Sequence, residues 1–71
     1  MLTVVRIDGE KVRAAREQRF LSQRELAGMA GINHNTVWRI EGRDSVDVHP
    51  RTIRRIAEAL SVDPTSLTPQ E

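Results

Sequence analysis

Three polar residues with recognition chemistry lie close together in the sequence: His34, Asn35 and Arg39. An Asn amide can bond adenine through both of its polar groups, an Arg guanidinium can do the same to guanine, and His can donate to a guanine acceptor. Val37 and Ile40 have the spacing of one apolar helix side, so a helix here turns the polar residues outward. The segment is therefore suited to hydrogen bonding with base edges in a DNA groove.

Further polar residues extend this candidate surface. Thr36 lies near the edge of the same helix side, where it can touch a thymine methyl group or a phosphate. Arg43 follows the helix and can reach the DNA backbone. Arg51 and Thr52 begin a later helix, whose free N–H groups and side chains can meet a phosphate. Trp38 has two interpretations of equal weight: its ring packs against the DNA backbone or Arg43, or it fills the edge of the core.

The same residues also have plainer explanations. Asn33 is expected to cap a helix whether or not it touches nucleic acid. His34 and Asn35 can be ordinary solvated residues, and Arg39 can be a partner in a surface ion pair. Arg54 belongs with the charges that are more often simply solvated, as does the neighbouring Arg55. The sequence by itself leaves these alternatives open.

Five segments carry the signature of a helix start, in which a capping or first-turn residue lies between two apolar residues five positions apart. In the second of them, Ser22 and Glu25 form a capping box. We expect helices near residues 9–19, 23–30, 34–42, 50–60 and 64–67. The predicted fold class is all-α, with one domain over residues 1–71. The first six residues are expected as an extended arm or an edge strand.

A tight turn joins the second and third expected helices. Gly31 can adopt a positive φ, Ile32 can fill the angle between the helices, and Asn33 can cap the next one. Two helices joined by three or four residues including Gly form a helix-turn-helix. Its second helix is short enough to enter the DNA major groove.

At these residues the sequence resembles the Cro/lambda-repressor-like helix-turn-helix family, the XRE-type transcriptional regulators. The matching positions are Ser22, Gln23, Leu26, Ala27, Gly31, Ile32, Asn33, Val37, Ile40, Glu41, Ile53, Ile56, Ala57 and Leu60. The resemblance implies a compact five-helix domain whose third helix reads bases through His34, Asn35 and Arg39, with Asn33 and Thr36 at the margin. It also implies that Gln23 bonds a phosphate and braces the third helix, and that Arg16 and Glu41 form a partly buried ion pair.

Composition narrows the classes of function. The chain has no Cys, which excludes disulfides, thiol nucleophiles and Cys-based zinc sites. The two His residues, without a third ligand nearby, make a poor metal site. We find no catalytic Ser/His/Asp arrangement and no glycine-rich phosphate loop, so we expect neither an enzyme nor a cofactor. No apolar run approaches the ~20 residues of a membrane span. The expected location is the cytoplasm, with the nucleoid.

The charge is unevenly distributed. The net charge is +1, but residues 1–55 carry +4 and residues 56–71 carry −3. All cations except Lys11 are Arg, which suits phosphate and guanine recognition. We therefore expect a sequence-specific regulator of transcription that binds double-stranded DNA, most simply a repressor that binds a palindrome as a homodimer. The alternative is a protein-binding module, such as an antitoxin or adaptor, with a toxin or co-regulator as partner.

Overall fold

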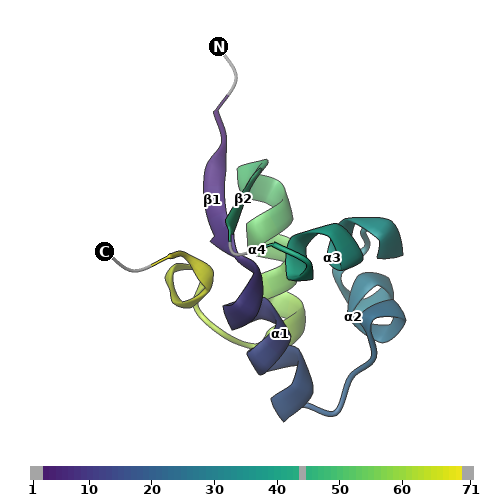
Figure 1. The fold of residues 1–71 in the computed structure, drawn as a ribbon. Coiled ribbons are helices and arrows are strands. Elements are labelled where there is room, and N and C mark those ends of the chain that lie inside the picture. Colours follow the sequence, from purple (N-terminus) through teal and green to yellow (C-terminus); the bar gives the residue numbers. More distant parts are fainter. Residues whose placement is uncertain (1–2, 44, 70–71) are drawn as a thin grey trace.

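The computed structural model describes residues 3–43 and 45–69 (Figure 1). In chain order, the elements are β1 (Val5–Asp8), α1 (Gly9–Gln18), α2 (Gln23–Ala30), α3 (His34–Glu41), β2 (Ser45–Val48), α4 (Pro50–Leu60) and a 3-10 turn, η1 (Pro64–Leu67). The helices α2 and α3 pack side by side, and η1 packs against α4 and α1. The four α-helices follow the expected segments, with the first and third each ending one residue earlier.

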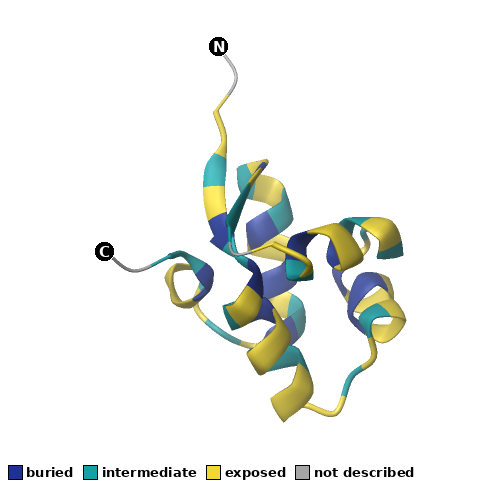
Figure 2. Ribbon diagram, in the orientation of Figure 1, coloured by how far each residue is buried: buried dark blue, intermediate teal, exposed yellow. Residues whose placement is uncertain are grey.

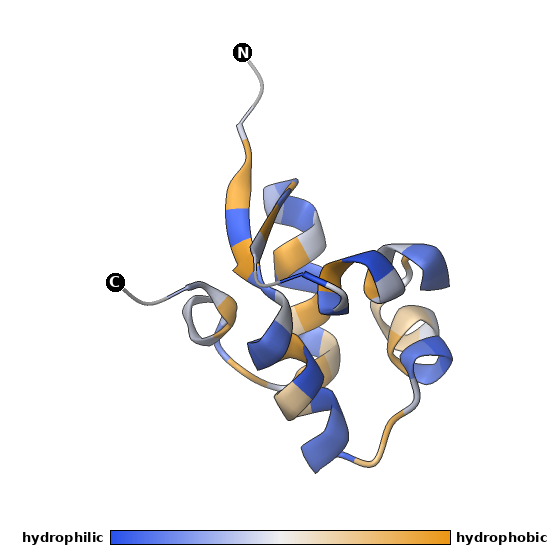
Figure 3. Cartoon of the chain, in the orientation of Figure 1, coloured by the Kyte–Doolittle hydropathy of each residue, from blue (hydrophilic) through white to orange (hydrophobic). Residues whose placement is uncertain are grey.

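A two-stranded antiparallel sheet corrects the expected all-α class. Strand β1 pairs with β2 in the register Val5↔Val48 and Ile7↔Val46, so these apolar residues share one side of the sheet. Ile7 and Val48 are buried in the core, and the other two pack against it. Figure 3 shows hydrophobic positions, in orange, along both strands. Strand β1 begins in the segment expected as an extended arm or an edge strand, whereas β2 was not expected. Each strand has four residues and gains its partner only through the fold, so the pairing is not visible in either segment alone.

The expectation of a fifth α-helix is wrong. The fifth expected helix is a 3-10 turn of four residues, started by the Asp63 side chain and Pro64. Gly42 ends α3 with φ and ψ of −80° and 0°, in the right-handed region, so this helix lacks the left-handed ending that Gly31 gives α2. The backbone conformation therefore changes little at the end of α3. Strand β2 begins at Ser45, four residues after the last residue of α3, Glu41.

Three helices end in the same hydrogen-bonded motif. At the end of α2, the N–H of Gly31 donates to Gly28 and that of Ile32 to Ala27, with Gly31 at φ 69°. This is a Schellman ending. The ends of α1 and α4 repeat both bonds with non-glycine residues in the left-handed position, at Phe20 and Ser61. In each case the next residue is apolar and packs against the core: Leu21, Ile32 and Val62.

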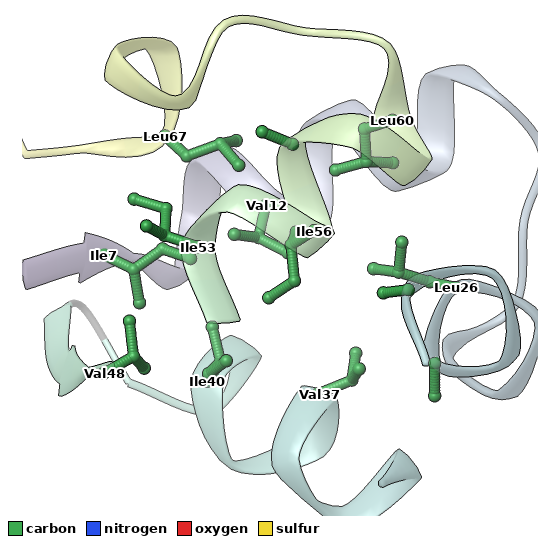
Figure 4. Close-up of a cluster of buried hydrophobic side chains, with 13 residues drawn as sticks. Ile7, Val12, Leu26, Val37, Ile40, Val48, Ile53, Ile56, Leu60 and Leu67 are labelled. Atoms are coloured by element: carbon green, nitrogen blue, oxygen red, sulfur yellow. The ribbon is translucent and has the colours of Figure 1, made fainter. Parts of the chain in front are cut away.

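The core lies where the helices and the sheet meet (Figure 4). Its buried side chains are Ile7, Val12, Leu26, Ala27, Ala30, Val37, Ile40, Val48, Ile53, Ile56, Ala57, Leu60 and Leu67. Figure 2 shows buried positions on the inward sides of the elements and exposed positions on their outer sides. Because Val37 and Ile40 are fully buried, the opposite side of α3 faces outward.

Candidate nucleic-acid interface

The turn between α2 and α3 sets the direction of the third helix. Asn33 has extended backbone angles, and its side chain accepts a hydrogen bond from the Asn35 N–H at 2.7 Å. The helix cap expected of Asn33 is therefore present. The Arg55 guanidinium donates to the Gly31 carbonyl at 3.4 Å, which adds a contact from α4 to the turn. Sequence patterns had marked Arg55 only as a solvated charge, because this contact spans two helices.

The outward side of α3 brings together most of the candidate base-reading residues. Asn35 and Arg39 are exposed, and neither side chain makes a hydrogen bond to another described residue. A hollow of about 370 Å³ on this side is lined by Asn35, Thr36, Trp38, Arg39 and Arg43. Thr36 is half-buried at its edge, and His34 is likewise half-buried. The polar groups on this surface are therefore available to an external partner.

Trp38 belongs to the outer surface of α3. It is 66% exposed, which rules out the interpretation as a filler of the core edge. Together with Arg39, Gly42 and Arg43, it lines a second hollow beside the first. Indole combines an apolar ring with a single N–H donor, so it can pack on a sugar and donate to a phosphate. The remaining interpretation is that the Trp38 ring packs against the DNA backbone or against Arg43.

A partly buried ion pair connects the third helix to the first. Arg16 donates to both carboxylate oxygens of Glu41, at 2.7 Å from Nε and 2.8 Å from Nη2. The two side chains are only 13% and 3% exposed. The hydrogen bond to Glu41 raises the pKa of Arg16, so the guanidinium stays charged. The ion pair expected from the family resemblance is thus present, and it is bidentate.

Two more contacts complete this junction. The third nitrogen of Arg16, Nη1, donates to the Leu21 carbonyl at 2.7 Å, in the turn between α1 and α2. The Gln23 amide donates to Glu41 Oε1 at 3.1 Å. Gln23 therefore braces α3 through Glu41, and the position of the recognition residues depends on α1 and α2.

The start of α4 differs from the expected phosphate site. The N–H of Arg51 donates to His49 Nδ1 at 3.1 Å, and that of Thr52 donates to the His49 carbonyl at 2.8 Å. These main-chain donors therefore already have partners, because His49 caps the helix. Neither Arg51 nor Thr52 lines the hollows beside α3. Only their side chains, exposed in Arg51 and half-buried in Thr52, are left for a phosphate.

Residues 3–43 and 45–69 contain neither a membrane-spanning helix nor a cluster of metal ligands. No helix there combines the length and the apolar character that crossing a membrane requires. No three His, Asp or Glu residues in these ranges are grouped so that they could hold a metal ion.

A family model described as a helix-turn-helix domain matches residues 9–69. The chain belongs to the helix-turn-helix domain family. The match covers the ion pair, the turn at Gly31 and the whole of α3, and it confirms the resemblance seen in the sequence. As an XRE-like member, the chain is similar to the helix-turn-helix domains found in regulators of transcription.

Two proteins that are similar to this helix-turn-helix domain are named as regulators. The HTH-type transcriptional repressor RghR of Bacillus subtilis (strain 168) is 39% identical over 54 residues, which cover 76% of this chain and 40% of RghR. The chain thus spans about two fifths of the length of that relative. The restriction-modification controller protein C.AhdI from Aeromonas hydrophila has a TM-score of 0.72 and 30% identity, over 82% of this chain and 86% of C.AhdI.

The same helix-turn-helix fold also occurs inside an enzyme. A hydroxyethylphosphonate dioxygenase structure matches 93% of this chain with a TM-score of 0.80 and 29% identity, but the match covers only 14% of the dioxygenase. The fold by itself therefore does not determine function. The side chains on the outward side of α3 must carry the functional argument.

Proposed function

We propose that this helix-turn-helix domain binds double-stranded DNA sequence-specifically and regulates transcription as a repressor. In this proposal, a homodimer binds a palindromic operator and places one α3 in the major groove of each half-site. The observation that carries it is the outward side of α3, where Asn35 and Arg39 are exposed without internal hydrogen-bond partners. Similarity to RghR, which is named a repressor, supports the direction of regulation.

Each side chain has a role in the proposed complex. Asn35 and Arg39 read base edges, since an Asn amide fits adenine and an Arg guanidinium fits guanine. His34 and Thr36 contribute from the edge of the helix. The residues assigned to the DNA backbone are Gln23, Asn33, Trp38, Arg43, Arg51 and Thr52. Backbone contacts fix the register of the protein on the duplex but carry little sequence information.

Selection from a pool of random duplex DNA tests this proposal. We expect one enriched inverted repeat, with half-sites about one helical turn apart. Sedimentation of the selected duplex with the protein should show two chains on each duplex. Recovery of all sequences equally would overturn sequence-specific recognition, and one chain on an asymmetric site would overturn the dimer.

The Arg39→Ala variant tests base reading directly. Loss of the guanidinium should weaken binding to the selected site by about 1–3 kcal/mol and relax preference at one base pair in each half-site. Arg54→Ala is the matched control, because Arg54 is an exposed Arg on α4 that lines neither hollow beside α3. Equal losses in both variants would show that Arg39 contributes only charge.

A protein-binding role, as in an antitoxin or adaptor, is the second candidate. It is favoured by Phe20, which is 93% exposed at the turn between α1 and α2. A protein partner that is lost in Phe20→Ala and retained in Arg39→Ala, together with no enriched DNA sequence, would support this role. Loss of specific DNA binding in Arg39→Ala would instead support the repressor.

A further inference from the structure

A polar hollow lies beside the outward side of α3, at the junction of three helices. Its volume is about 260 Å³, and its lining residues are Arg13, Arg16, Gln23, Trp38, Glu41 and Gly42. They come from α1, α2, α3 and the residue after α3. Trp38 is shared with the hollow that Asn35 and Arg39 line. The two hollows are therefore neighbours, and a duplex contacted by α3 passes close to this polar one.

The charges of this hollow are not all available to a ligand. Arg16 and Glu41 neutralise each other through two hydrogen bonds, and Gln23 bonds the same carboxylate. Arg13 is the remaining cation of the lining. Its Nε contacts Glu17 at 3.3 Å, and the two side chains are 61% and 57% exposed. Exposed pairs at this spacing are weak, so Arg13 can exchange Glu17 for a stronger anionic partner.

We propose that this hollow is a subsite for one DNA backbone phosphate and that Arg13 is its cation. The inference rests on the proposed DNA-binding function and adds Arg13, which the sequence marks as a partner of Glu17 at helical spacing and not as a DNA contact. The guanidinium of Arg13 can bond two oxygens of a phosphodiester. Gln23 has a second amide hydrogen beyond the one given to Glu41, and Trp38 has its indole N–H. Glu17 competes with the phosphate for Arg13.

This competition gives opposite expectations for two variants. Arg13→Ala should weaken binding to the selected duplex and reduce the slope of log K against log salt by about 0.9. Relative to 1 M salt, a slope smaller by about 0.9 corresponds to an affinity about eightfold lower at 0.1 M salt. Glu17→Ala should tighten binding with no reduction of slope, because it frees Arg13 and removes a nearby negative charge. If Arg13 serves only to pair with Glu17, both variants should lower the melting temperature and leave the slope unchanged.

The chain offers a matched control pair. Arg6 and Asp47 form a similarly exposed contact at 3.5 Å on the sheet. Arg6→Ala should leave the salt slope unchanged, as should Asp47→Ala. The measurement is fluorescence anisotropy of the labelled selected duplex at several salt concentrations, with circular dichroism of each variant. Arg13→Gln, which keeps a long polar side chain, should lose the same slope as Arg13→Ala.

The outcomes separate this inference from the function on which it rests. If the natural chain binds no DNA, the proposed function fails and the phosphate site fails with it. If the natural chain binds its selected site and Arg13→Ala keeps the same slope, only the phosphate site is overturned. A reduced slope in Arg13→Ala and in Arg6→Ala alike would also overturn it, since any Arg would then have the same effect.

Discussion

At the scale of single residues, Phe20 occupies a position that suits glycine. Its φ is 57°, and its side chain is 93% exposed. A left-handed conformation costs an L-residue about 1–2 kcal/mol, and the exposed ring recovers little of it. Phe20→Gly should therefore raise the free energy of unfolding by about 0.5–1 kcal/mol, after allowing for the greater flexibility of unfolded Gly. Urea denaturation at pH 7 measures the change.

Two other helix ends serve as controls for this prediction. Ser61 has the same φ of 57° at the end of α4, so Ser61→Gly should be stabilising in the same direction. Gly31 already has the favourable residue, and Gly31→Ala should destabilise the chain by about 1 kcal/mol. A destabilised Phe20→Gly variant would mean that the ring makes a stabilising contact that outweighs the backbone strain.

Glu25 makes helix α2 sensitive to acid. The Ser22 N–H donates to the Glu25 carboxylate at 2.8 Å, and this bond, with the Ser22 side chain, lowers the pKa of Glu25 below its ordinary value of 4.5. A lowered pKa in the folded state adds stability above the ordinary pKa, and that stability is lost as pH falls through the folded value. The capping box should therefore weaken below about pH 4.5.

The Glu25→Gln variant isolates this effect because it removes the titration and keeps a side chain that can accept the same bond. We expect the natural chain to melt at a higher temperature than Glu25→Gln at pH 7, with the difference vanishing near pH 2. Asp63, whose pKa the Thr65 side chain and N–H lower, remains in both chains and does not affect the comparison. A difference that stays constant between pH 7 and pH 2 would contradict this account.

At the scale of elements, Gly9 allows the first turn of α1 to lie directly against the end of α3. A Cβ atom at Gly9 would overlap the carbonyl oxygens of Ile40 and Arg43. Both obstacles are backbone atoms, so α1 or the end of α3 must move. Gly9→Ala should therefore destabilise the chain by about 1–3 kcal/mol. Because α3 carries the recognition residues, affinity for the selected duplex should fall even under conditions where the variant is fully folded.

Gly28→Ala is the matched control for Gly9→Ala. Gly28 lies in α2, and a Cβ there would meet no atom within 4 Å. Since Ala is the better helix former, this substitution should stabilise the chain by about 0.5–1 kcal/mol. Equal thermal stability of the two Ala variants, measured by calorimetry, would show that the contact of Gly9 with α3 is not close in solution.

At the scale of the whole molecule, the Arg16–Glu41 pair connects the packing of α1, α2 and α3. Glu41→Ala leaves the Arg16 guanidinium largely buried without its counter-charge, and should cost about 3–5 kcal/mol. Replacing both residues by apolar ones, as in Arg16→Met with Glu41→Leu, should cost less than Glu41→Ala alone. Thermal denaturation of the three chains tests this order. A double variant as unstable as Glu41→Ala would show that the pair itself stabilises the fold.

Much of the helical part of the fold could be predicted from the sequence. Caps and helix ends depend on a few adjacent residues, so Ser22, Asn33 and Gly31 identified the boundaries of the helix-turn-helix. The apolar spacing of Val37 and Ile40 likewise showed which side of α3 is buried. The sheet could not be predicted in the same way, because β1 and β2 pair across about forty residues and neither strand is stable without the other.

In the candidate site, too, local features followed from the sequence and contacts between helices did not. The sequence by itself determined that His34, Asn35 and Arg39 lie on α3, because helical periodicity is a local property. Only the tertiary structure decided that Trp38 is exposed, that the N–H groups of α4 are already bonded, and that Arg13 shares a hollow with Gln23. These facts depend on how separate helices pack, and distances between helices follow from the whole core rather than from any one segment.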